Sequence, residues 1–159
     1  MEFILILFST LEELTFMRTT LTHIKKIELS KSLILPLAEK ITAGFPSPAE
    51  DFLDLSIDLN KEFIKHPNAT FFGKVSGDSM IDAGLNDGDL LIIDKSLEPK
   101  NNSIAICYLD GEFTVKRVLY EKDKLWLVAE NKNYQPIPVY PENDFVIWGI
   151  VTTVIKKIS

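Results

Sequence analysis

Short apolar segments separated by turn-forming residues follow one another from Ala69 to the C-terminus, and they constrain the fold more than any other feature. Valine, isoleucine, phenylalanine and tyrosine are concentrated in these segments, as is typical of β-strands. The pattern predicts strands over Ala69–Val75, Asp89–Asp94, Ser103–Leu109, Glu112–Leu119, Lys124–Ala129 and Phe145–Lys156. We therefore predict a mainly β fold.

Turn chemistry indicates how two of these segments are joined. Asp110-Gly111 stands between two apolar segments, and this dipeptide is a strong signal for a tight β-hairpin. The hairpin places Lys116 on the returning strand. Because side chains alternate along a strand, Glu112, Thr114 and Lys116 share one face of it.

Before residue 67 the apolar pattern changes to helical spacing. Apolar residues recur three and four positions apart between Ala49 and His66, which predicts an amphipathic helix with a break near Asp58. The segment Leu33–Lys40 has a weaker helical character.

One serine and one lysine stand out as a candidate catalytic pair. Ser79 lies in the turn at 76–80, and Lys116 follows 37 positions later. A serine hydroxyl is a weak nucleophile until a base removes its proton, and a lysine can be that base only when burial keeps it neutral. Ser-Lys is a known variant of activated-serine catalysis. Most turn serines and strand lysines are nevertheless solvated and inert, so the pair needs support from its neighbours.

The neighbouring residues give this support. Thr114 lies two positions before Lys116, so its hydroxyl can hydrogen bond to the lysine amine on the same face of the strand. Gly77 allows the chain to turn sharply ahead of Ser79. The backbone N–H groups around Asp78 and Ser79 are candidates to bind a developing oxyanion.

Four segments together resemble the UmuD branch of the LexA-type self-cleaving serine proteins, the peptidase S24 family. They are GFPSPAED (44–51), SGDSMID (76–82), NDGDLLIID (86–94) and DGEFTVKR (110–117). The resemblance runs from about Ala43 to the C-terminus. It implies a LexA/signal-peptidase-like β-rich catalytic domain with a short helical segment and an extended N-terminal arm.

The resemblance also implies roles for individual residues. Ser79 falls on the family's nucleophile, Lys116 on its general base, and Ala43-Gly44 on the bond that is cut. It further implies self-cleavage stimulated by a RecA–single-stranded DNA filament during the SOS response. A homodimer and partnership with an error-prone Y-family DNA polymerase are the other implied properties.

These assignments divide the chain at residue 43. We predict a leader or arm, 1–43, that self-cleavage removes, and a serine peptidase-like dimerisation domain, 44–159. Residues 1–16 are interpreted as a mis-called start, because Met17 offers another initiation point; a short amphipathic helix is the alternative. Pro46 and Pro48 favour extended geometry just after the predicted cut, which suits a peptidase substrate, although a plain linker would show the same prolines.

Charge and rare residues narrow the possible partners. The net charge of −6 lies entirely after residue 43, since the leader holds five basic and five acidic side chains. An acidic body disfavours direct sequence-specific DNA binding, so we expect a link to DNA to run through a protein partner. The single cysteine, Cys107, suits a core position in a reducing cytoplasm. His23 and His66 are isolated, and the apolar start is short, so we expect no metal, cofactor or membrane span.

The last predicted strand, 145–156, is apolar on both of its faces over most of its length. A terminal edge strand of this kind would need a partner, which favours a homodimer. A central position in the core is the alternative.

Other functions stay open as alternatives. A repressor of the LexA or phage type would need a helix-turn-helix domain, and the residues before Gly44 are too few for its three helices. A bacterial signal peptidase shares the Ser-Lys pair, but that type has a membrane anchor, and Ile81-Asp82 stand where it usually has a proline. The third alternative is a non-catalytic polymerase accessory subunit.

Overall fold

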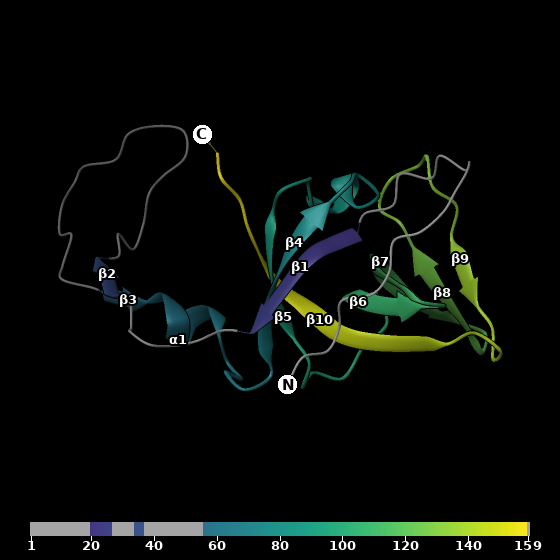
Figure 1. Ribbon diagram of the computed structural model, residues 1–159, viewed down its shortest axis with the longest axis horizontal. Helices are drawn as coiled ribbons and strands as arrows, with labels where there is room; N and C mark the ends of the chain where they lie inside the picture. Colours follow the sequence, from purple (N-terminus) through teal and green to yellow (C-terminus); the bar gives the residue numbers. More distant parts are fainter. Residues whose placement is uncertain (1–19, 27–33, 37–55, 159) are drawn as a thin grey trace.

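The computed structural model describes residues 20–26, 34–36 and 56–158, and these form a predominantly β structure (Figure 1). The described strands are β1 (Thr20–Lys26), β2 (Ile34–Pro36), β3 (Ser56–Asp58), β4 (Thr70–Ser76), β5 (Leu90–Asp94), β6 (Ile104–Leu109), β7 (Glu112–Glu121), β8 (Lys124–Val128), β9 (Ile137–Val139) and β10 (Phe145–Ile155). A short helix, α1 (Leu59–Phe63), and a 3-10 turn, η1 (Ile81–Ala83), accompany them. The prediction of a mainly β fold is confirmed. In this part of the chain, no helix has the length and apolar character needed to cross a membrane.

Eight of the strands form one antiparallel sheet in the order β1-β4-β5-β10-β6-β7-β8-β9. Strands β2 and β3 pair with each other in a separate two-stranded sheet. In Figure 1, β2, β3 and α1 lie at one end of the molecule, and β8 and β9 lie at the other. The strands that carry the candidate site, β4 and β7, lie between these ends.

The β6–β7 hairpin forms as predicted from its turn residues. Leu109 pairs with Glu112 across the turn, and the two central residues, Asp110 and Gly111, have positive φ values of 47° and 96°. Turns with two left-handed central residues match the twist of a hairpin and favour Asp-Gly. The resulting register sets Lys116 opposite Ala105 on β6, in the interior of the sheet.

All six strands predicted after residue 67 are present, each within two residues of its predicted bounds. Strand β9 is missing from the prediction. It has three residues and contains Pro138, which cannot donate a hydrogen bond to a neighbouring strand. An apolar pattern this short carries no reliable periodic signal, and β9 forms because β8 offers it a pairing edge.

The predicted helices before residue 67 are largely wrong in the described part of the chain. Residues 56–58 form β3, and only Leu59–Phe63 of the helix expected over 49–66 is helical. Residues 34–36 form β2 instead of the weak helix expected over 33–40, and the remainder of both ranges lies outside the described residues. Pairing between β2 and β3 overrides the helical spacing here. Asp58, the expected break, caps α1 by accepting hydrogen bonds from the N–H groups of Asn60 (3.0 Å) and Lys61 (3.3 Å).

Strand β10 lies in the middle of the sheet, so the expectation of a terminal edge strand is wrong. It pairs with β5 on one side and with β6 on the other. Its two apolar faces follow from this central position, which is the alternative stated above. A homodimer stays a prediction, but it loses the argument based on this strand.

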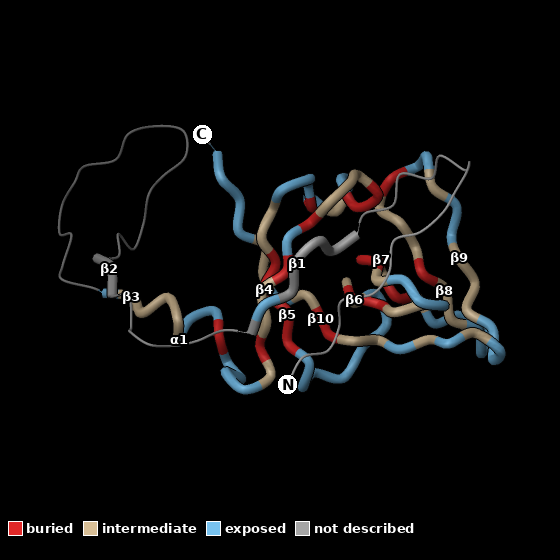
Figure 2. The backbone as a smooth tube through the Cα atoms, viewed as in Figure 1, coloured by how far each residue is buried: buried red, intermediate tan, exposed pale blue. Residues whose placement is uncertain are grey.

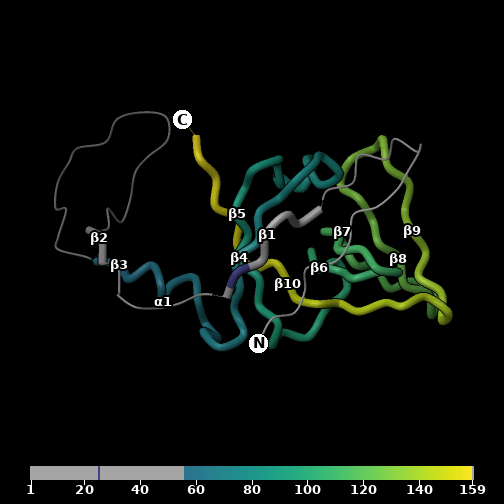
Figure 3. Tube along the Cα trace, in the orientation of Figure 1, coloured from purple at the N-terminus to yellow at the C-terminus, as the bar shows by residue number. Residues whose placement is uncertain are grey.

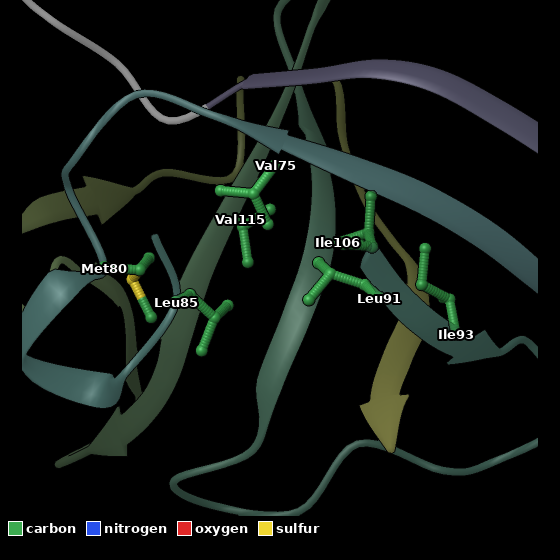
Figure 4. Packing of buried hydrophobic residues seen from close by; sticks show 7 residues of the cluster. All are labelled: Val75, Met80, Leu85, Leu91, Ile93, Ile106 and Val115. Atoms are coloured by element: carbon green, nitrogen blue, oxygen red, sulfur yellow. The ribbon is translucent and has the colours of Figure 1, made fainter. Parts of the chain in front are cut away.

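Two clusters of buried side chains stabilise the large sheet. Figure 2 shows the buried residues in red along the backbone. The first cluster consists of Val75, Met80, Leu85, Leu91, Ile93, Ile106 and Val115 (Figure 4). The second consists of Ala105, Cys107, Val118, Leu127 and Ile150. Cys107 is fully buried, as predicted, and burial raises the pKa of its thiol to about 12.

The close approach of β10 to β5 depends on Gly149. This glycine stands at an irregularity in the register of β10. A Cβ atom added there would lie 2.7 Å from Cγ2 of Ile93, a fully buried and β-branched side chain. We expect Gly149→Ala to lower the free energy of unfolding by about 1–3 kcal/mol, measured by urea denaturation, because the core has to shift.

The half-exposed Val146 on the same strand provides a control for this prediction. Val146→Ala is expected to change the free energy of unfolding by no more than about 0.5 kcal/mol. Equal stability of wild type and Gly149→Ala would contradict the close approach of β10 to β5.

Candidate active site

The connection between β4 and β5 presents Ser79. Strand β4 ends at Ser76, and Gly77 follows with a φ of 92°, a left-handed conformation that reverses the chain without strain in glycine. Ser79 comes two residues later and is completely buried. The next residue, Met80, is also completely buried and inserts into the first core cluster (Figure 4). The serine is therefore held by a turn whose C-terminal side is fixed in the core.

Lys116 reaches this serine from β7. Its amine lies 2.8 Å from the Ser79 Oγ, 3.0 Å from the Thr114 Oγ1 and 3.0 Å from the carbonyl oxygen of Val115. The lysine is only 3% exposed and Thr114 only 8%. The structure thus brings together three residues that the sequence singled out, and their catalytic roles stay predictions.

The environment of the lysine amine suits a base better than a solvated cation. Burial removes water from an ammonium group and disfavours its charged form. The Ser79 hydroxyl is within the distance at which a proton can pass directly to the amine nitrogen. Thr114 and the Val115 carbonyl orient the amine, because both lie at hydrogen-bond distance from it.

A cavity of about 290 Å³ adjoins the lysine. Thr114 and Lys116 line it from β7, Tyr134 and Pro136 line it from the segment that leads into β9, and Pro138 lines it from β9 itself. Much of the wall is apolar, and the buried amine is at its edge. The cavity is therefore suited to a peptide side chain or backbone held next to the Ser-Lys pair.

The other predicted site residues are Gly77, Asp78 and the two residues of the cleavage point. The Gly77 N–H donates to the Asp87 carboxylate at 2.8 Å, so this hydrogen bond fixes the turn. None of the hydrogen bonds found within the described residues uses the Asp78 N–H, which leaves that group as a candidate oxyanion donor. Ala43 and Gly44, the predicted cleavage point, lie outside the described residues.

Two further residues, Asn131 and Tyr134, hold the serine turn, and the sequence analysis missed both. The side-chain amide of Asn131 donates to the Asp78 carbonyl at 3.0 Å and approaches its carboxylate at 3.4 Å. The Tyr134 hydroxyl donates to the other oxygen of the same carboxylate. In addition, the Asp82 N–H donates to the Glu130 carbonyl at 2.8 Å. The turn carrying Ser79 is therefore clamped by the connection between β8 and β9.

The clamp also fixes the protonation state of the tyrosine. Burial, the hydrogen bond to Asp78 and the negative charge of Asp78 together raise the pKa of Tyr134 to about 12. The phenol is therefore neutral at ordinary pH and keeps the proton that it donates. Because Tyr134 also lines the cavity, it connects that cavity to the turn behind Ser79.

The described residues contain no group of three or more His, Cys, Asp or Glu side chains arranged to hold a metal ion. His66, which the sequence left isolated, lies with its Nδ1 atom 2.6 Å from the Asp94 carboxylate. Ser96 donates to the same carboxylate through its N–H at 2.8 Å and its hydroxyl at 2.6 Å. This group fixes the end of β5.

Comparison with known proteins agrees with the geometry of the site. The family model "Peptidase S24-like" matches residues 36–152. Protein ImpA of Salmonella typhimurium is 44% identical over 128 residues, covering 79% of this chain and 86% of ImpA. Protein MucA of Escherichia coli is 41% identical over 115 residues, covering 72% and 78%. The LexA repressor of Ectopseudomonas mendocina is 40% identical over 124 residues, covering 77% of this chain and 60% of the repressor.

The clamp around Asp78 generates a prediction about stability. Tyr134→Phe removes one hydrogen bond to a carboxylate, so we expect a loss of about 1–2 kcal/mol in the free energy of unfolding, measured by urea denaturation. Tyr140→Phe makes the same chemical change at a tyrosine that is 55% exposed and should leave stability unchanged. If the two variants were equally stable, the clamp would have no energetic role.

Proposed function

The chain belongs to the peptidase S24-like family, in its UmuD-like branch, and we propose that it cuts itself by Ser-Lys catalysis. Ser79 is the nucleophile and Lys116 is the general base. The observation that carries this proposal is the 2.8 Å separation between the lysine amine and the serine hydroxyl. Both groups are buried, which is the environment that a neutral lysine requires.

The reaction proceeds in two halves. Lys116 Nζ accepts the Ser79 proton while Oγ attacks the Ala43 carbonyl carbon and forms a tetrahedral intermediate. The intermediate collapses as the Ala43–Gly44 bond breaks, and the ammonium returns its proton to the departing Gly44 amine. A water molecule then loses a proton to Lys116 and attacks the carbonyl carbon of the Ala43 ester. As the ester bond breaks, Lys116 returns this proton to the Ser79 Oγ, and Ala43 is left with a free carboxyl group that ionises.

Backbone N–H groups of the turn that carries Ser79 stabilise the oxyanion. The N–H of Asp78 is our leading donor, and the N–H of Ser79 is the second. The clamp from Asn131 and Tyr134 supports this assignment, because it fixes the position of Asp78. A donor fixed before the reaction stabilises developing charge without the cost of reorganisation.

The substrate is the leader of the chain itself. Cleavage at Ala43–Gly44 gives a leader, 1–43, and a product, 44–159. Small residues on both sides of the bond leave room for an approaching hydroxyl, and the prolines at 46 and 48 favour the extended backbone that a peptidase cavity accepts.

The chain is an SOS mutagenesis protein of the UmuD type, so we assign the self-cleavage to the SOS response. We propose that an activated RecA–single-stranded DNA filament stimulates the reaction. The product, as a homodimer, then supports an error-prone Y-family DNA polymerase in the cytoplasm. The net charge of −6, all of it after residue 43, favours a protein partner over direct contact with DNA.

Intact-mass measurement tests the nucleophile and the bond together. Wild-type protein and Ser79→Ala are incubated at pH 7.5 and 10, with and without the activated RecA filament. We expect a fragment beginning at Gly44 in the wild type only, because the alanine variant keeps the fold but lacks the hydroxyl. If both proteins stay whole under every condition, a non-catalytic polymerase accessory role replaces self-cleavage.

The pH dependence of self-cleavage tests the base. A lysine accepts a proton only as the free amine, so the spontaneous rate should rise with pH as more of Lys116 is neutral, and level off once all of it is. The rate is measured by the loss of intact mass between pH 6 and 10 in samples shown to be folded. A flat profile over this range would count against Lys116 as the base.

A further inference from the structure

Strand β1 belongs to the leader yet completes the large sheet of the body. It covers Thr20–Lys26, before the predicted cut, and pairs antiparallel with β4. Five residue pairs are in register, from Thr20 opposite Ser76 to Lys26 opposite Phe71. Figure 1 shows β1 lying alongside β4, and Figure 3 shows β4 next to β5. The other side of β4 is occupied by β5, so β1 covers the remaining edge of β4.

Hydrolysis of one peptide bond after residue 43 leaves this ladder untouched. The cut falls between β2 and β3, so it separates both leader strands, β1 and β2, covalently from their partners. The β2–β3 pairing spans three residue pairs and includes Pro36, which has no N–H to donate. Among the leader residues that the structure describes, the longer β1–β4 ladder is therefore the main attachment to the body.

Charge complementarity favours the same attachment. The whole leader, 1–43, has no net charge, but β1 contains Lys25 and Lys26 and no acidic residue, whereas the part after residue 43 carries the whole net charge of −6. The lysines of β1 are therefore attracted to the acidic body, and salt weakens this attraction.

We propose that the leader stays bound to the body through β1 after the cut, as a non-covalent edge strand on β4 that the β1 segment of another leader can replace. This inference rests on the proposed self-cleavage for its biological role. Cleavage then acts by making a bound strand replaceable, and strand exchange is the step that changes the surface of the protein.

The exposed edge has the properties of a strand-docking site. Without β1, the β4 residues 71–76 present unpaired N–H and C=O groups along one side, and an extended chain can add to such an edge through backbone hydrogen bonds. β4 runs directly into Gly77 and Ser79, so the docked strand lies beside the segment that carries the nucleophile. β1 is the occupant for which the structure gives a register.

The test makes the cut independent of Ser79. A full-length Ser79→Ala chain receives the recognition sequence of a site-specific protease around residue 43 and is cut by that protease. Native mass spectrometry and gel filtration at micromolar concentration then measure whether the fragments remain together. We expect a one-to-one complex that dissociates on dilution or at high salt.

Proline variants identify the strand. Successive residues of a strand turn their N–H groups to opposite sides, so either Ile24→Pro or Lys25→Pro must remove a donor that faces β4. At least one of them should release the leader about tenfold more readily, whereas Lys31→Pro, between β1 and β2, should not. An unlabelled peptide of residues 17–30 in excess should displace the leader from the cut protein, and a scrambled peptide should not.

The outcomes separate this proposal from the proposed function. If the fragments part immediately after cutting, or if the peptide fails to displace a leader that stays bound, the docking site is overturned. Equal retention by all three proline variants would also overturn it. Failure of the wild type to cut itself would contradict the proposed Ser-Lys catalysis but not the binding of the leader, because the engineered cut does not use Ser79.

Discussion

The hydrogen bond between the Lys116 amine and the Ser79 hydroxyl depends on almost every other feature of this sheet. The two residues come from β7 and from the β4–β5 connection, and neither would be buried without its own set of neighbours. The Asp-Gly hairpin fixes the register of the lysine, while Gly77 and the buried Met80 fix the turn of the serine. Burying two polar groups away from water costs free energy unless each has a hydrogen-bond partner. The core that removes water from the amine therefore also has to supply its hydrogen-bond partners.

The clamp shows how the turn is fixed on both sides. On one side Met80 packs into the apolar cluster, and on the other Asp78 accepts hydrogen bonds from Asn131 and Tyr134. Ser79 lies between an apolar anchor and a polar one, which limits how far its hydroxyl can move from the amine. Positioning of this kind matters for proton transfer, because small displacements from the productive geometry slow such reactions strongly. Tyr134 extends the arrangement to the wall of the cavity, where a bound peptide would contact it.

The sequence predicted what depends on local chemistry and missed what depends on long-range contacts. Strands with long β-branched segments and the Asp110-Gly111 turn were predictable because residue type and spacing determine them. The position of β10 was not, since its two apolar faces fit both a central strand and a dimer interface. Asn131 and Tyr134 lie more than fifty residues from Asp78, and no local pattern signals that contact. The helix expected over 49–66 is replaced in part by β3 because pairing with β2 outweighs weak helical spacing.

The same leader is both the proposed substrate and, through β1, a structural strand of the body. A single hydrolysed bond removes no backbone hydrogen bond between β1 and β4, so the cut changes connectivity and the entropy of dissociation rather than the contacts themselves. Before cleavage, the covalent link keeps β1 at a high effective concentration near β4. After cleavage that advantage is lost, and the β1 segment of one leader can be exchanged for that of another. A sheet edge that is covered in the intact chain and open to exchange in the cut chain would therefore let one proteolytic event control whether the final strand can be replaced.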